Sequence, residues 1–347
     1  MTEASNLRVD VVLCTRNRSE LLARTCEAIL GQDYPAELWR LLIVDNASTD
    51  DTFAVALALA QRFPGRVRAV QCHQLGHSAA RNFGVKETSA EIVAFTDDDA
   101  LPDPGWLRTL VQVIDREGAE ASGGPVELVL SGELPRWFLE NYLLYLAIWR
   151  PADEFRQLTY NEFPRGVNLA FRRQVFDRYG FFSSHLGLRG ERQLFCEETE
   201  LCLRIERNGG RIVYSPQSLV RHCVDARRFT VNWLSRRFAA QGRSEAIVNW
   251  MHGGLRGLVL GSRVHLANLR AASWQSVLAL RSAGFEGLTG TVPGPESQAE
   301  LQEAARILTH CRRRALFGYL RQIPLAFAAV PRYRPANGSK LERWTPP

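Results

Sequence analysis

Short apolar runs alternate with helical stretches through about the first hundred residues, and this alternation constrains the fold most. Residues 9–14, 41–44, 67–71 and 92–95 form short runs bounded by polar or turn-forming residues, which is typical of buried strands. The stretches at 19–30, 52–62 and 76–84 between them are expected helices. This order predicts an α/β fold, with a mostly parallel sheet flanked by helices.

Three consecutive aspartates, Asp97, Asp98 and Asp99, directly follow the fourth apolar run. They leave the sheet at the carboxyl end of a strand, where open α/β sheets bind ligands. Mg²⁺ and Mn²⁺ take oxygen ligands and often bridge carboxylates to substrate phosphates. We therefore interpret Asp97 and Asp99 as serving a metal–diphosphate pair. The alternative is a solvated acidic turn that caps the next helix.

The pattern changes after residue 100. We expect helices at 106–117 and 196–205, and strands at 126–130, 166–171, 212–214 and 218–223. Beyond about residue 225 the chain is basic and helical, with helices expected at 229–250, 263–283 and 299–330 and a loop at 289–297. Pro324 is expected to break or kink the last helix. We predict a domain at 1–224, a helical region at 225–330 and a flexible tail at 331–347.

Composition narrows the class of protein. The net charge is +6, and all but two of the 43 Lys and Arg residues are Arg, which suits anionic ligands but is too scattered to indicate nucleic acid. Seven cysteines without a Cys-x-x-Cys pair favour free thiols in a reducing compartment. Without a signal-like start or an apolar run of membrane-spanning length, we expect a cytoplasmic protein. Peripheral contact with the inner membrane face is a further hypothesis.

Several stretches together resemble the inverting family 2 glycosyltransferases, which have a GT-A fold. They are the Val-Val-Leu-Cys-Thr-Arg-Asn run at 11–17, Gln-Asp-Tyr-Pro at 32–35, Ile-Val-Asp-Asn-Ala-Ser-Thr-Asp at 43–50, Ala-Arg-Asn-Phe-Gly at 80–84, Phe-Thr-Asp-Asp-Asp at 95–99 and Cys-Glu-Glu-Thr-Glu-Leu at 196–201. Their order and spacing agree with the family across roughly residues 9–223. The resemblance implies a GT-A sheet with helices on both faces and a helical C-terminal extension.

The resemblance also implies a nucleotide-diphosphate sugar donor and a divalent metal, Mg²⁺ or Mn²⁺. The implied donor-binding residues are Thr15, Asn17 and Asp45 at the nucleotide, Arg81 at the diphosphate, and the acidic motif of Asp97, Asp98 and Asp99. In that motif Asp99 would be the metal ligand, Asp97 would support ribose or metal, and Asp98 would be the spacer. The alternatives are that Asp45 caps a turn and that Arg81 lies on the surface.

An inverting transfer needs one base to take the proton of the acceptor hydroxyl. The family supplies it from the second member of a Glu-Asp pair, which here is Glu197–Glu198. Glu198 is therefore the expected base, and the Glu in place of Asp leaves Glu197 open as the alternative. Two acids stabilising a helix N-terminus would explain the pair without catalysis. By the same resemblance His222 would lie near the metal or the diphosphate, with a structural histidine as the alternative. Gly166 and Asn168 would lie on the acceptor side.

The sequence therefore predicts metal-dependent, inverting transfer of one sugar to a hydroxyl, in polysaccharide, glycolipid or glycosylated-metabolite biosynthesis. Polymerising members carry Gln-x-x-Arg-Trp and membrane helices, whereas residues 241–245 read Gln-Gly-Arg-Ser-Glu. A catalytically degenerate nucleotide-sugar-binding or scaffolding protein is the alternative. A nucleotidyltransferase would need a glycine-rich loop that residues 14–18 lack. Basic residues interleaved with apolar ones at 299–330 fit contact with an anionic membrane and a lipid-linked acceptor, or a helix packed on the enzyme.

Overall fold

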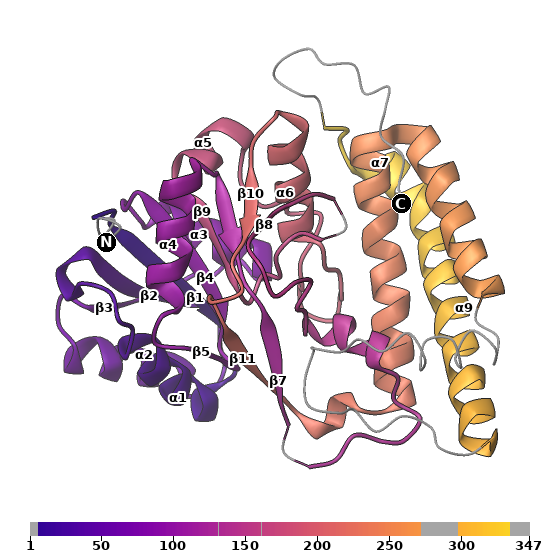
Figure 1. The fold of residues 1–347 in the computed structure, drawn as a ribbon, viewed down its shortest axis with the longest axis horizontal. Helices are drawn as coiled ribbons and strands as arrows, with labels where there is room; N and C mark the ends of the chain where they lie inside the picture. Colours follow the sequence, from indigo (N-terminus) through magenta and orange to yellow (C-terminus); the bar gives the residue numbers. More distant parts are fainter. Residues whose placement is uncertain (1–5, 131, 161, 272–297, 334–347) are drawn as a thin grey trace. The chain divides into compact units, whose positions relative to one another are not determined.

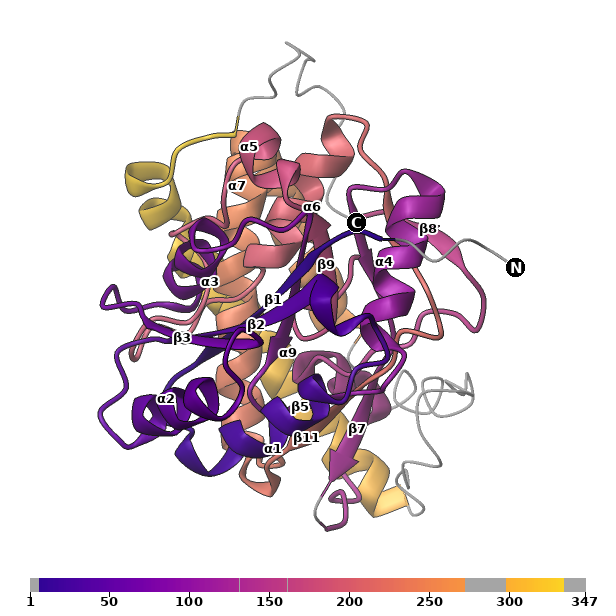
Figure 2. The same cartoon turned by 90° about the vertical axis from the view of Figure 1, so that its left-hand side faces the viewer.

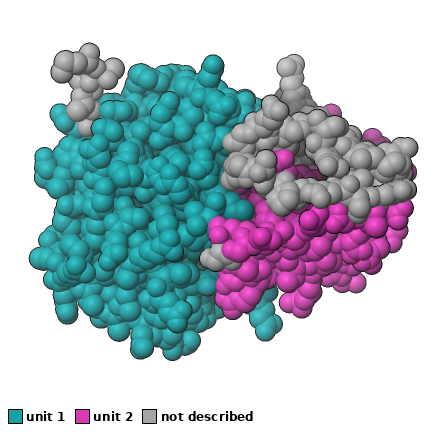
Figure 3. All heavy atoms as spheres, turned by 60° about the horizontal axis from the view of Figure 1, so that its bottom comes forward, with its two compact units in different colours: residues 1–129, 149–191, 197–223 teal, residues 130–148, 192–196, 224–347 magenta. Residues whose placement is uncertain are grey.

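A computed structural model describes residues 6–130, 132–160, 162–271 and 298–333. The chain forms two compact units, coloured separately in Figure 3. The sheet unit comprises residues 1–129, 149–191 and 197–223, and the helical unit comprises 130–148, 192–196 and 224–347. The helical unit thus includes residues 130–148 and 192–196, which belong to the predicted first domain. The predicted boundary between residues 224 and 225 lies one residue after the point where the chain passes from the sheet unit to the helical unit.

The sheet unit is built on one large, mixed sheet of β1 (Val9–Thr15), β2 (Trp39–Asp45), β3 (Val67–Gln71), β4 (Ile92–Asp97), β6 (Ala121–Gly123), β8 (Arg156–Leu158), β9 (Leu169–Arg172) and β10 (Ile212–Tyr214). The strand order is β3-β2-β1-β4-β9-β6-β10-β8. The first four strands are parallel, and β9 runs antiparallel between β4 and β6. The predicted α/β class with a mainly parallel sheet is confirmed.

Helices cover both faces of this sheet. They are α1 (Ser19–Leu30), α2 (Thr52–Arg62), α3 (His77–Lys86), α4 (Trp106–Glu117), α5 (Gln174–Tyr179) and α6 (Glu197–Arg207), with the short 3₁₀ turn η1 (Ala36–Leu38). Figure 2 shows α1 and α2 on one face and α3 on the other. Right-handed crossovers produce this arrangement when strand order reverses beside β1. Gly84 lets α3 approach the sheet, since a Cβ there would overlap Val12.

A second, three-stranded sheet adjoins the end of β4. It consists of β5 (Ala100–Pro102), β11 (Val220–Val224) and β7 (Val126–Leu130), with β11 in the middle. The strand β5 is not predicted from the sequence, because three residues are too few for a periodic signal. Its antiparallel register places His222 opposite Ala100, and so brings a residue far along the chain beside the aspartate triplet.

The helical unit is dominated by two long helices, α7 (Val231–Arg270) and α9 (Gln298–Ala329), with the 3₁₀ turns η2 (Glu140–Leu146) and η3 (Ala226–Arg228) (Figure 1). Gly254 interrupts α7 with φ 55° and ψ −142°, a conformation that favours glycine. Both halves of α7 pack on α9 around buried Tyr319, whose hydroxyl accepts from Asn249 Nδ2 at 2.9 Å and donates to the Leu258 carbonyl at 3.1 Å.

The helix α1 begins at Ser19, as predicted; its N-cap is Arg18, and the Ser19 hydroxyl donates to Asp50. The predicted break of the last helix at Pro324 is wrong. The helix α9 continues through Pro324 without a break. Because Pro324 has no backbone N–H, the carbonyl of Leu320 lacks the helical hydrogen bond that another residue would donate. The side chain of Leu320 is exposed. The predicted helical residues 272–283, the loop at 289–297 and the tail from 334 lie outside the described residues. Among the described helices, none is both long and apolar enough to cross a membrane.

Candidate active site

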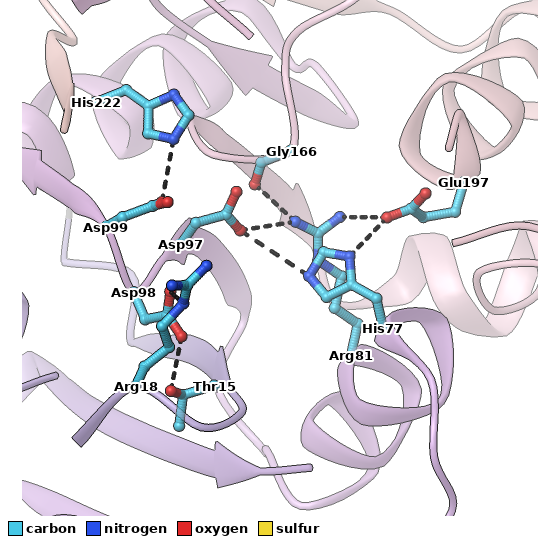
Figure 4. A network of polar contacts seen from close by, with 10 residues as sticks. All are labelled: Thr15, Arg18, His77, Arg81, Asp97, Asp98, Asp99, Gly166, Glu197 and His222. Carbon is cyan, nitrogen blue, oxygen red and sulfur yellow. Dashed lines mark hydrogen bonds and ion pairs between the residues drawn. The ribbon is translucent and has the colours of Figure 1, made fainter. Parts of the chain in front are cut away.

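The candidate site lies at the carboxyl end of β4, where the three aspartates separate (Figure 4). Asp98 turns away from its neighbours, and its carboxylate accepts from Thr15 Oγ1 at 2.7 Å. Thr25 Oγ1 donates to the Asp98 carbonyl at 2.8 Å. Burial and the charge of Asp99 raise the pKa of Asp98 to about 7. Asp98 therefore connects the end of β4 to the end of β1 through its hydrogen bond with Thr15. This position is consistent with the expected spacer role of Asp98 in the motif.

Asp99 faces an imidazole that the second sheet supplies. Asp99 Oδ1 lies 3.1 Å from His222 Nε2, and both side chains are at most 10% exposed. A backbone hydrogen bond of 2.8 Å from Cys223 N to the Asp99 carbonyl holds the strand in this register. The prediction that Asp99 and His222 come together rested on resemblance alone, and the pairing of β5 with β11 explains it.

Arg81 on α3 connects the aspartate motif with the acidic helix. Its Nη2 lies 3.3 Å from Asp97 Oδ1 and 3.0 Å from the Gly166 carbonyl, and its Nη1 lies 3.3 Å from Glu197 Oε1. The residue is 2% exposed, so the alternative of a surface arginine is wrong. A buried guanidinium is retained where carboxylates and carbonyls satisfy its fork of donors.

The sequence analysis missed His77, which lies in the same network (Figure 4). Its Nδ1 lies 2.9 Å from Glu197 Oε1, and its Nε2 lies 4.0 Å from Asp97 Oδ1. His77 is the first residue of α3, directly after Gly76 at φ 135°. Its place four residues before Arg81 in an expected helix was the available signal, because residues four apart on a helix share one face.

The two glutamates at the start of α6 have different environments. His77 hydrogen-bonds Glu197 and, together with the positive charge of Arg81, outweighs burial and lowers the pKa of Glu197 to about 2. Burial, followed by the negative charge of Glu197, raises the pKa of Glu198. Glu197 is thus held as an anion by the Arg81 guanidinium and the His77 ring, whereas Glu198 binds a proton more readily. Neighbouring carboxyls with separated pKa values are typical of sites that move protons.

The residues expected at the nucleotide lie at the ends of β1 and β2. Asp45 is fully buried. Its Oδ2 accepts from Ser48 N at 3.2 Å and from Gln71 Nε2 at 3.4 Å, so the turn-capping alternative holds in part. Its Oδ1 is buried and has no hydrogen-bond partner among the described residues, a costly arrangement that a ligand N–H would relieve. Asn17, at φ 53°, accepts from Thr49 N at 2.8 Å.

The two residues expected on the acceptor side immediately precede β9. Gly166 contributes its carbonyl to Arg81, and a Cβ there would collide with the guanidinium. Asn168 is fully buried: its Oδ1 accepts from Trp106 Nε1 at 2.9 Å, and its Nδ2 donates to the carbonyls of Pro125 and Ser218 at 2.9 and 2.7 Å. Because both N–H groups and the oxygen of its amide have buried internal partners, we propose a structural role for Asn168.

The donor atoms around Asp99 fit a hard divalent cation. Asp99 and His222 lie side by side, and the carboxylate of Asp97 is one third exposed near them. Magnesium-type sites commonly take one or two carboxylates, and substrate phosphates complete the coordination. No group of three or more His, Cys, Asp or Glu side chains among the described residues forms a cage for an ion. Asp99 and His222 are the pair that could hold a metal if a diphosphate supplied further ligands, and Asp97 is the other carboxylate of the motif.

Comparison with known proteins identifies the family of this chain. The model of glycosyl transferase family 2 matches residues 10–180. The glucosyl-dolichyl phosphate glucuronosyltransferase of Haloferax volcanii is 30% identical, over 71% of this chain and 79% of that relative. The succinoglycan biosynthesis protein ExoM of Rhizobium meliloti is 27% identical, over 88% and 91% of the two chains.

Among solved structures, a mannosyltransferase from Pyrobaculum calidifontis, in complex with GDP-Man and Mn²⁺, is similar with a TM-score of 0.56. The similarity covers 91% of this chain and 87% of that one at 20% sequence identity, and it shows a shared GT-A fold. The residue patterns, the sheet order and the relatives agree, and the chain belongs to glycosyl transferase family 2.

Proposed function

We propose that this glycosyltransferase moves a single sugar, with inversion, from a nucleotide-diphosphate sugar to an acceptor hydroxyl, and that it uses a divalent cation. The observation that carries the proposal is the contrast between Glu197 and Glu198. Arg81 and His77 form hydrogen bonds with the carboxylate of Glu197. Burial and the charge of Glu197 raise the pKa of Glu198. A single-displacement transfer requires one base that takes the proton of the acceptor hydroxyl.

The donor would lie along the carboxyl ends of β1, β2 and β4. The unpartnered Oδ1 of Asp45 would accept a hydrogen bond from the base or ribose of the nucleotide. Asp97, Asp99 and His222 would hold Mg²⁺ or Mn²⁺ against the diphosphate; when bound, this ion would offset the negative charge of the leaving group. Arg81 adds a fixed positive charge near the same point, oriented before the donor arrives.

The proton of the acceptor hydroxyl would pass to Glu198. As that proton leaves, the hydroxyl oxygen bonds to the anomeric carbon on the face opposite the diphosphate. The bond between that carbon and the diphosphate oxygen breaks, and the configuration inverts. Glu197 would take no proton, because Arg81 and His77 keep its pKa near 2. Its role would be to position Arg81 and to keep the pKa of Glu198 raised.

The acceptor is proposed to be a lipid-linked intermediate of polysaccharide or glycolipid assembly. The name of the Haloferax relative describes transfer to glucosyl-dolichyl phosphate, and the Rhizobium relative is named for succinoglycan biosynthesis. A polyprenyl chain stays in the bilayer, so an enzyme that uses such an acceptor would work in peripheral contact with a membrane surface.

The test is a screen of nucleotide sugars with Mn²⁺ or Mg²⁺, followed by NMR of the product formed on a polyprenyl-phosphate glycoside. We expect one donor class to raise the melting temperature, turnover to stop when EDTA removes the metal, and the new bond to have the opposite anomeric configuration to the donor. Retention of configuration, or undiminished turnover in EDTA, would contradict the proposal.

A further inference from the structure

Large apolar side chains are exposed mainly on one part of the helical unit. Seven of the eleven such side chains among the described residues lie on α9 or on α7 after Gly254. They are Leu255, Val259 and Leu266 on α7, and Phe317, Leu320, Leu325 and Phe327 on α9. Four of them are more than half exposed, with Leu255 highest at 64%. A gathering of this kind marks an interaction surface.

The exposed side chains lie opposite the faces that pack in the unit. On α9 the buried residues include Cys311, Ala315 and Tyr319, which follow one another at every fourth position. Phe317 and Leu320 project on the other side of the helix, because 3.6 residues complete a turn. Close packing fixes this rotation of α9: a Cβ at Gly242 of α7 would overlap the carbonyl oxygen of Ala315.

The same two segments carry positive charge without negative charge. Residues 246–271 and 304–330 contain no Asp or Glu. Their exposed arginines are Arg256, Arg263 and Arg270 on α7, and Arg306, Arg313, Arg314 and Arg321 on α9. Arg306 has an ion-pair partner in Glu303, which precedes the 304–330 stretch by one residue. Nearby, burial and the positive charges of Arg314 and Arg192 lower the pKa of Arg243, as expected where like charges gather.

The two segments lie side by side, since His265 and Leu258 of α7 both contact Tyr319 of α9 (Figure 1). Arginine can bury its aliphatic stem beside apolar side chains while its guanidinium stays at a polar boundary. Apolar insertion combined with attraction to anionic headgroups is how amphipathic helices bind a membrane interface. A solvated basic face would explain the arginines but not the exposed Phe317 and Leu325.

We propose that α7 after Gly254, together with α9, forms a docking surface for an anionic phospholipid membrane. This inference rests on the proposed peripheral function and assigns its surface, but the binding itself needs neither donor, metal nor acceptor. The arginines would contact headgroup phosphates, and Phe317, Leu320, Leu325 and Phe327 would enter the headgroup–acyl boundary. The face of α7 with Leu255 and Val259 would extend the contact.

The experiment is sedimentation of the full chain with vesicles of phosphatidylcholine alone, or with about one third phosphatidylglycerol, at low and high salt. We expect binding to the anionic vesicles only, weakened by salt. The double variant Arg313→Gln/Arg321→Gln should lower the partition coefficient about 25-fold, at roughly fivefold per arginine. The variant Phe317→Gln/Leu325→Gln should weaken binding and make the remainder more sensitive to salt.

The matched control is Leu57→Gln/Arg62→Gln on α2, which also replaces an exposed leucine and an exposed arginine. It should bind as the wild type does, and circular dichroism should show that all variants are folded. The proposal is overturned if the wild type does not bind anionic vesicles at low salt, or if the control loses as much binding as the α9 variants. It is also overturned if the α9 variants convert a dimer into monomers, because the surface would then be an interface between two copies of this chain. Since no turnover is measured, a failed transfer reaction cannot produce any of these outcomes.

Discussion

Exchanging Glu197 and Glu198 separately for Gln should produce opposite effects on stability and turnover. Glu197 is an ionised carboxylate held by Arg81 and His77, so Glu197→Gln removes a charge from a buried network. Glu198 has a raised pKa because burial and Glu197 disfavour its charged form. Glu198→Gln therefore removes an unfavourable charge and the proposed base together.

The magnitude for Glu197 follows from its pKa, which falls from the usual 4.5 to about 2. At about 1.4 kcal/mol per unit, Glu197→Gln should lower the free energy of unfolding by about 3 kcal/mol at neutral pH. A lowered pKa stabilises the fold above pH 4.5, and this contribution is lost as pH falls toward 2. The difference between wild type and Glu197→Gln should accordingly narrow below pH 4.5. Removing one partner of a buried ion pair typically lowers the free energy of unfolding by about 3–5 kcal/mol, in agreement with the value expected for Glu197→Gln.

For Glu198 the signs reverse. A carboxyl with a raised pKa destabilises the folded state at neutral pH, so Glu198→Gln should unfold no earlier than the wild type and is expected to be more stable. Its turnover should fall about 10²–10⁴-fold, the usual loss for a general base. Glu197→Gln should keep most of its turnover, and the acid limb of its pH–rate profile should move to lower pH because Glu198 loses a negative neighbour.

The measurements are urea unfolding at several pH values and initial rates with saturating donor from pH 4 to 9. The assignment is refuted if Glu197→Gln loses its turnover while Glu198→Gln keeps it, or if Glu197→Gln is as stable as the wild type at pH 7. Unchanged turnover in both variants would exclude the pair from proton transfer.

Three further changes test the metal, nucleotide and packing assignments. Asp99→Ala should abolish Mn²⁺-dependent binding of nucleotide diphosphates in calorimetry, and unchanged metal dependence would exclude Asp99 as a ligand. Asp45→Asn should weaken nucleotide binding about 10- to 100-fold, as expected when hydrogen bonds to a charged acceptor are lost; equal affinity would leave Asp45 with only its turn-capping role. Gly242→Ala should destabilise the helical unit by about 1–3 kcal/mol because the new methyl group overlaps the Ala315 carbonyl. An unchanged thermal unfolding midpoint by circular dichroism would show that the two helices can separate at no cost.

Local patterns determined most of the sheet unit. The apolar runs and capping residues marked the strands β1 to β4, because a buried strand needs a continuous apolar sequence whatever lies beside it. The order and spacing of the polar motifs were enough to indicate Asp45, Arg81, the aspartate triplet and the glutamate pair. A short strand such as β5, and the passage of α9 through Pro324, leave no such signal in a local window.

Only the tertiary structure decided which of these residues face one another and in what state of charge. His77 and Glu197 are 120 positions apart in the chain and hydrogen-bond to each other, so only the tertiary fold brings the first residues of α3 and α6 together. The difference between Glu197 and Glu198 likewise depends on buried neighbours, since adjacent identical residues are equivalent in sequence. The exposed apolar face of α7 and α9 became visible only when packing used the opposite face of each helix, because amphipathic spacing alone does not say which side meets a partner.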